Sequence, residues 1–286
     1  MSRVALATAF ALIAFAANSI LCRMALRQTS IDPASFTSVR IVSGAITLWL
    51  LVQLGNRRGS LGGTWASSFA LLAYATGFSF AYVAITAGTG ALLLFGAVQL
   101  VMIAAGLAAG ERINFRIAFG WVLAMSGLVT LVFPGVSAAP AVQSALMLCA
   151  GVAWGIYSLR GRRSGDPLRD TAGNFARAVP GALLISAIMW RHGAWDRMGV
   201  VLAILSGAIA SGVGYAAWYT ALPRMRSMTA ANLQLCVPVI AALCGAILFK
   251  EEITPRLMVA SIFVLGGVFV ATRATTVKPA LVDPND

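Results

Sequence analysis

The chain contains 286 residues, of which 59% are hydrophobic and 10% are charged. Soluble domains carry about 25% charged residues, so this composition excludes a water-soluble globular fold and indicates a membrane protein. Lysine and arginine outnumber aspartate and glutamate by 21 to 9, but the cations punctuate apolar runs and form no stripe. We therefore expect the lipid bilayer as a partner and no nucleic acid.

Ten apolar stretches are long enough to cross a bilayer, whose core requires about 20 helical residues with every backbone hydrogen bond made internally. In chain order they are Val4–Cys22, Pro33–Leu54, Trp65–Thr86, Thr89–Gly110, Ile117–Phe133, Val142–Leu159, Thr171–Trp190, Val200–Leu222, Met228–Phe249 and Leu257–Thr272. The connections between them are short. These stretches predict an all-α integral membrane protein of ten transmembrane helices.

The distribution of cations predicts the orientation of these helices. If the N-terminus lies in the cytoplasm, thirteen of the 21 lysine and arginine residues are on the cytoplasmic side and six are on the other side. The remaining two, Arg40 and Arg177, lie within spans. Cytoplasmic loops carry an excess of lysine and arginine, so both termini are expected in the cytoplasm.

The side chains of a metal site or a hydrolytic site are missing from the sequence. The cysteines lie in or at the ends of apolar runs without metal-ligand spacing: Cys22, Cys149, Cys236 and Cys244. The single histidine, His192, lies in a predicted loop. We therefore expect no metal, no cofactor and no enzymatic activity.

An internal repeat divides the chain into residues 1–136 and 137–286. A displacement of 137 residues aligns Arg40 with Arg177, and a displacement of 140 beyond Arg226 aligns Glu111 with Glu251. Matched charges carry more weight than matched apolar residues. Because each half has an odd number of helices, the second half is predicted to be inverted, which is typical of secondary transporters with alternating access. The alternative is a duplicated scaffold that transports nothing.

The repeated segments resemble those of a known family. The segments and motifs concerned are Gly88 to Val132, Met228 to Arg273, Pro238-Val239, Glu251-x-Ile253 and Ala153-Trp154-Gly155. Together they resemble the paired repeat of the ten-helix EamA-type carriers in the drug/metabolite transporter superfamily. One departure is that the first half has Ala16-Ala17-Asn18 where the second has Ala153-Trp154-Gly155.

This resemblance covers essentially the whole chain and carries expectations for fold and function. It implies a monomeric carrier of the bacterial inner membrane, with helices 1–4 and 6–9 around a central cavity and helices 5 and 10 at the periphery. Within the superfamily the chain looks most similar to bacterial amino acid exporters, including those for aromatic amino acids.

Polar and aromatic side chains within the spans are candidates to line the cavity. They are Asn18, Tyr74, Phe78, Tyr82, Gln99, Trp154, Tyr157, Ser211, Tyr215, Trp218 and Gln234. The rings suit an apolar substrate side chain and a substrate ammonium, while the amides suit both ends of a zwitterion. The alternatives are ordinary packing, helix-to-helix hydrogen bonds and an interfacial aromatic belt.

Three further residues are candidates for gating or a hinge: Arg40, Arg177 and Pro238. Both arginines lie close enough to span ends for an alternative role as anchors that snorkel to water. Pro238 is expected within the ninth span, where proline permits a kink.

No acidic residue lies within a predicted span. Proton-driven carriers commonly use an intramembrane carboxylate, so we expect the substrate to move down its own gradient, with a relay through loop carboxylates as the alternative. The sequence thus predicts a carrier of small amino acids or related metabolites, acting by export or facilitated diffusion. A multidrug or nucleotide-sugar exporter and a membrane scaffold remain open.

Overall fold

A computed structural model of the protein describes residues 3–55, 60–108, 115–133, 139–161, 164–221 and 233–274. In this part of the chain the regular elements are α1 (Arg3–Gln28), α2 (Pro33–Leu54), α3 (Trp65–Tyr82), α4 (Ala87–Ala108), α5 (Phe115–Val132), α6 (Ala141–Gly161), α7 (Pro167–Ile188), η1 (Trp190–His192), α8 (Arg197–Leu205), η2 (Ser206–Val213), α9 (Gly214–Ala221), α11 (Cys236–Phe249) and α12 (Pro255–Ala274). The described residues form helices and no strand, so the all-α prediction is confirmed.

The predicted spans correspond to these helices with small shifts. The first helix continues to Gln28, six residues beyond the predicted end at Cys22. The eighth span comprises α8, η2 and α9, which follow one another without a break and include a π-helical stretch at Ser206–Val213. Residues 109–114 and 222–232 lie outside the described part of the chain, and with them Glu111 and the start of the ninth predicted span.

Aspartate and threonine side chains begin several of the helices. Asp32 caps α2, Thr64 caps α3, Asp166 caps α7 and Asp196 caps α8, each accepting a hydrogen bond from a backbone N–H of the first turn. These caps satisfy backbone donors that have no partner within the helix. Several acidic residues that the sequence places outside the spans therefore help to define where the helices start.

The Asp32 cap is expected to make stability depend on pH. Burial opposes ionisation of this carboxyl, but hydrogen bonds from Ser35, Ala194 and Ala34 outweigh it and hold the pKa of Asp32 below its ordinary value. Because the unfolded chain has the higher pKa, the carboxylate stabilises the fold above about pH 4, and this contribution is lost as the pH falls through the folded-state pKa.

Replacement of Asp32 by alanine should therefore cost about 1 kcal/mol at neutral pH. The Asp32→Asn variant should flatten the decline of the melting temperature between pH 7 and acid. Thermal unfolding of the purified protein across this pH range measures both effects. An unchanged pH profile in Asp32→Asn would mean that this carboxyl is not responsible.

The outward faces of the helices suit a bilayer. Six helical segments among the described residues are long and apolar enough to span a membrane. Two further segments, Cys236–Phe249 and Pro255–Ala271, are apolar but shorter. Large apolar side chains are exposed on many helices, including Trp49, Phe69, Leu184 and Ile262. Water would disfavour such a surface, whereas lipid tails accept it.

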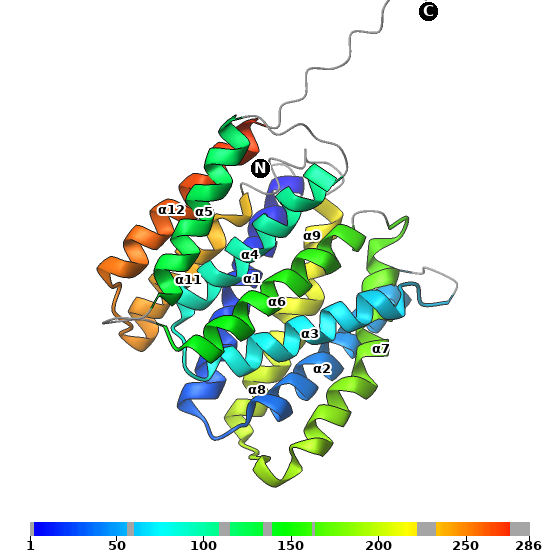
Figure 1. Ribbon diagram of the computed structural model, residues 1–286. Helices are drawn as coiled ribbons and strands as arrows, with labels where there is room; N and C mark the ends of the chain where they lie inside the picture. The colour runs from blue at the N-terminus through cyan, green and yellow to red at the C-terminus, as the bar shows by residue number, and fades with distance from the viewer. Residues whose placement is uncertain are drawn as a thin grey trace, which may run out of the picture.

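The helices pack in a recurring set of pairs (Figure 1). α5 lies along α12 at one side of the molecule, and α2 lies along α7 toward the opposite side. Between them α3 packs on α6, α4 on α11, and α1 on the helical segment formed by α8, η2 and α9. Side chains from α1, α2, α3, α4, α6, η2 and α9 are buried in the interior, and this is where the candidate site lies.

Small residues set the close approach of α5 and α12. A Cβ atom at Gly120 would lie 2.4 Å from the Gly267 carbonyl oxygen, and one at Gly127 would lie 2.9 Å from the Ala260 carbonyl oxygen. The two helices are therefore antiparallel, with Gly120 opposite Gly267 and Gly127 opposite Ala260.

Candidate substrate site

Arg40 lies in the interior of the helix bundle. It is the eighth residue of α2, and only 1% of its surface is exposed. The interpretation of Arg40 as an anchor that snorkels to water is therefore wrong, because the neighbouring helices cover this part of α2. Its Nη2 donates to the Tyr74 hydroxyl at 2.9 Å, and its Nε donates to Ser211 Oγ at 3.4 Å.

Aromatic rings also face the Arg40 guanidinium. Its Cζ atom lies 5.1 Å from the ring centroid of Tyr74 and 4.9 Å from that of Phe78. Both distances are within the range in which a ring quadrupole attracts a cation.

Asn18 extends this hydrogen-bond network to α1 and η2. Asn18 Nδ2 donates to the Tyr74 hydroxyl at 3.1 Å, and Ser206 Oγ donates to Asn18 Oδ1 at 2.6 Å. The Tyr74 hydroxyl thus accepts from both Asn18 and Arg40. The network joins α1, α2 and α3 of the first half with η2 of the second.

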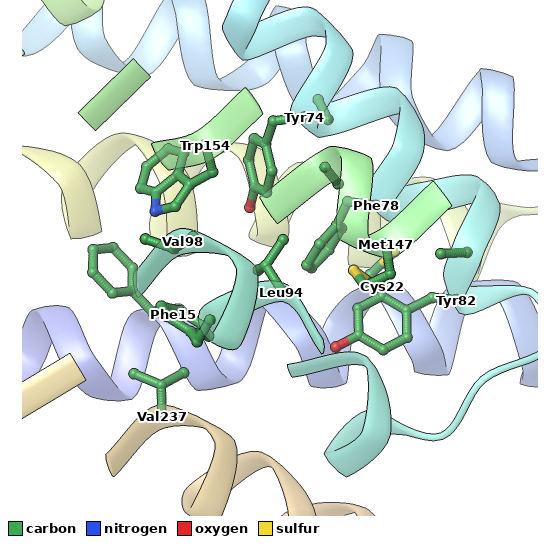
Figure 2. Packing of buried hydrophobic residues seen from close by; sticks show 14 of the residues in the cluster. Phe15, Cys22, Tyr74, Phe78, Tyr82, Leu94, Val98, Met147, Trp154 and Val237 are labelled. Atoms are coloured by element: carbon green, nitrogen blue, oxygen red, sulfur yellow. The ribbon is translucent and has the colours of Figure 1, made fainter. Parts of the chain in front are cut away.

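Trp154 of α6 is the centre of an aromatic cluster beside this network (Figure 2). Its ring centroid lies 4.9 Å from Tyr74, 4.9 Å from Tyr215 and 6.3 Å from Phe15. Figure 2 shows Trp154, Tyr74, Phe78 and Phe15 directed toward a shared interior, with Leu94 and Val98 of α4 among them.

The cluster is closed to solvent in this conformation. The exposed fractions of Tyr74, Phe78, Trp154 and Tyr215 are all 5% or less. The rings therefore occupy the centre that the family resemblance predicts to be a cavity. A shallow hollow between α11 and α12 is lined by apolar residues such as Val239, Leu265 and Phe269, which give it no means of binding a polar substrate.

Several predicted site residues lie beside the cluster. Tyr157 stacks on Trp154 with ring centroids 5.4 Å apart, and Trp218 contacts Phe15 at 5.7 Å. Gln99 on α4 and Gln234, just before α11, are both buried.

Tyr82 and a nearby ion pair connect several segments at one end of the bundle. Arg23 Nε lies 2.8 Å from Glu251 Oε1, and Arg23 Nη1 donates to the Tyr82 carbonyl at 3.0 Å. Glu251 Oε2 accepts from the Ala87 backbone N–H at 2.8 Å. Lys250, in the left-handed conformation, ends α11 just before Glu251. We call Arg23, Tyr82, Ala87 and Glu251 the Arg23 cluster.

The Arg177 side chain makes a contact near the start of α3, at the opposite end of that helix from Tyr82. Its Nη1 donates to the Gly62 carbonyl at 2.6 Å, while Asp170 Oδ1 and Asn174 Oδ1 accept from the backbone N–H groups of Gly63 and Thr64. These contacts hold the segment before α3 against α7. Arg177 is therefore half-buried and contacts the segment before α3, whereas Arg40 is fully buried, although the repeat aligns them.

Pro238 occupies the first turn of α11 and not the middle of a straight helix. Leu233 and Gln234 are helical, Leu235 forms a turn, and α11 begins at Cys236. In a first turn the missing proline N–H costs no intrahelical hydrogen bond.

The sequence did not identify three members of the site: Phe15, Phe175 and Ser206. Phe15 and Phe175 contact Tyr215 with ring centroids 5.8 and 5.9 Å away. A phenylalanine in an apolar run resembles any lipid-facing residue, and a lone serine in a helix resembles any small packing residue. Only three-dimensional contact distinguishes them.

No set of His, Cys, Asp and Glu side chains in the described residues is arranged to bind a metal ion. The groups that the site does contain are hydrogen-bonding side chains, aromatic rings and the Arg40 guanidinium. This chemistry suits recognition of a small polar molecule with an apolar part.

Comparisons with known proteins identify the family. Residues 143–273 match the EamA-like transporter family. An uncharacterised protein of Pseudomonas aeruginosa is 49% identical over 267 residues, covering 93% of each chain. The threonine/homoserine exporter RhtA of Escherichia coli K12 is 34% identical over 168 residues, covering 55% of this chain and 54% of the exporter.

A protein of known crystal structure shares the fold. It aligns with a TM-score of 0.68 at 17% identity and covers 96% of this chain and 99% of its own. The predicted family resemblance is thus confirmed. The chain belongs to the EamA-like transporter family and is a multi-pass membrane transporter of the drug/metabolite type.

Proposed function

We propose that this transporter exports small amino acids or related metabolites across the bacterial inner membrane by alternating access, as a monomer with both termini in the cytoplasm. The carrying observation is the interior site in which Arg40, Asn18 and Tyr74 from one half meet Trp154, Ser211 and Tyr215 from the other. The local similarity to an exporter of threonine and homoserine supports an amino acid substrate.

The packing of α5 on α12 supports two inverted halves. A displacement of 140 residues takes Gly120 to Ala260 and Gly127 to Gly267. The contact between Gly120 and Gly267 therefore maps onto the contact between Ala260 and Gly127, as a two-fold axis requires. The pairing of α2 with α7 and of α4 with α11 follows the same relation.

Closure at both ends supports alternating access. The Arg23 cluster joins α1, the end of α3, the start of α4 and Glu251, two residues after the end of α11. At the other end Asp170, Asn174 and Arg177 hold the segment before α3. We infer that the described conformation is an occluded intermediate, and that each set of contacts breaks in turn to admit or release substrate.

The charges of the site favour movement down the substrate gradient. In the described part of the chain, Arg40 and Asn18 form hydrogen bonds with the hydroxyls of Tyr74, Ser211 and Ser206, and no carboxylate is among these partners. A site of this kind lacks the proton-exchanging group that proton-coupled carriers commonly contain.

Flux in liposomes tests this function. Purified protein should accelerate uptake of labelled threonine, homoserine or phenylalanine without an imposed proton gradient. Trp154→Ala should reduce this flux at least about tenfold, because it removes the central ring of the site. Trp49→Ala, which removes an exposed ring on α2, should leave it unchanged. Flux equal to that of empty liposomes across a broad amino acid panel would contradict the proposal, and flux of sugar nucleotides or cationic drugs instead would assign a different cargo.

A further inference from the structure

Arg40 is a fully buried cation without a protein counter-ion in the described residues. The single ion pair found there joins Arg23 to Glu251, at the end of the bundle. The titratable groups close enough to Arg40 to influence it electrostatically are Tyr74, Tyr215 and Cys22. All three are neutral in their ordinary state near pH 7. Burial of an unpaired charge is costly, so an interior arginine of this kind indicates a functional role.

Two polar groups of the site also lack hydrogen-bond partners among the described residues. They are Arg40 Nη1 and the Tyr215 hydroxyl, and both are buried. The other two guanidinium nitrogens of Arg40 donate to Tyr74 and Ser211. Buried donors are rarely left without acceptors, so these two groups indicate an acceptor that is not part of the protein.

We propose that Arg40 Nη1 and the Tyr215 hydroxyl bind the carboxylate of the transported substrate. This inference rests on the proposed function and restricts it to substrates that carry a carboxylate. A guanidinium recognises both carboxylates and phosphates. A single cation with neutral neighbours balances one negative charge, which favours a carboxylate over a phosphate monoester with its charge of nearly −2.

The rings around Arg40 complete the recognition of such a substrate. Phe78 and Tyr74 already flank the guanidinium, and Trp154 joins Tyr74 to Tyr215. Because these rings fill the centre, entry of substrate requires at least one of them to turn aside. The ammonium and side chain of an amino acid would then contact aromatic faces while the carboxylate contacts Arg40.

The test compares each amino acid with its carboxamide, which has almost the same shape but no negative charge. Uptake of L-threonine and L-phenylalanine, and competition by their carboxamides, would be measured in liposomes containing wild type, Arg40→Gln, Arg40→Lys or Tyr215→Phe. Arg191→Gln, at an exposed arginine, is the matched control. Wild type and Arg191→Gln should prefer the acids by about 30-fold or more.

Arg40→Gln should abolish this preference for the acid, and Arg40→Lys should restore part of it. Tyr215→Phe keeps the ring and removes a hydroxyl that has no hydrogen-bond partner among the described residues, so it should fold normally and lower the preference. This variant decides the question if Arg40→Gln does not fold. A purely structural role of Arg40 would change the amount of folded protein but not the acid-to-amide ratio.

Two outcomes would overturn the inference. Equal transport of acids and carboxamides by wild type, or a wild-type ratio in both Arg40→Gln and Tyr215→Phe, would remove the carboxylate assignment while the amino acid carrier stands. Failure of wild type to transport any acid or carboxamide would overturn the carboxylate site and the proposed function together.

Discussion

Replacement of Gly267 by leucine is expected to destabilise the protein by about 3 kcal/mol, near the upper end for overpacked interfaces. A Cβ atom at this position would lie 2.5 Å from the Gly120 carbonyl oxygen and 2.6 Å from the Ala124 backbone nitrogen. Neither backbone atom can move without separating α5 from α12. The free energy of unfolding, measured by denaturation in detergent micelles, should fall accordingly.

Gly266 provides a matched control for this prediction. It is the preceding residue of the same helix, and a Cβ atom there would meet no other part of the described chain within 4 Å. Gly266→Leu should therefore be neutral or slightly stabilising, since leucine favours a helix over glycine by up to about 1 kcal/mol. Equal effects of the two variants would mean that α5 and α12 do not approach each other at Gly267.

The Glu251→Gln variant should cost about 3–5 kcal/mol, the range observed when one partner of a buried ion pair is removed. Glu251 accepts from Arg23 at 2.8 Å and from the Ala87 backbone at 2.8 Å, and both side chains of the ion pair are largely buried. Without the carboxylate, the Arg23 guanidinium would remain buried and uncompensated. The same detergent denaturation assay measures this loss.

Glu252→Gln is the control, because Glu252 is the next residue and is exposed. That variant should change stability by less than about 0.5 kcal/mol. Replacement of both Arg23 and Glu251 by methionine should recover part of the loss, since no unpaired charge then remains. If Glu251→Gln were as stable as Glu252→Gln, the ion pair between Arg23 and Glu251 would not be contributing to stability.

The lengths of the apolar stretches were sufficient to predict the helices, because a bilayer requires every span to be an apolar helix of about 20 residues. α2 begins at Pro33 as predicted, with Asp32 as its cap. The π-helical stretch at Ser206–Val213 could not be predicted in this way. This stretch packs closely against α2, where a Cβ atom at Gly207 would meet the Arg40 carbonyl oxygen.

Several side chains named as candidates from the sequence lie together in the structure, but their arrangement could not be predicted. Tyr74 and Phe78 were expected on one face of a helix, and they do face the same interior. The depth of Arg40 was misjudged because distance along a helix does not show how far neighbouring helices cover it. Phe15 gave no signal because its importance comes from contact with Trp154 and Tyr215, which are distant in sequence.

Substrate counterflow in liposomes is the most direct test of an alternating-access carrier. Liposomes loaded with unlabelled L-threonine should take up labelled L-threonine faster than unloaded liposomes, because a loaded carrier returns with its site occupied. This acceleration should persist without a proton gradient and disappear in Trp154→Ala. Equal uptake by loaded and unloaded liposomes, or no uptake by either, would contradict a carrier whose interior site opens alternately to the two sides.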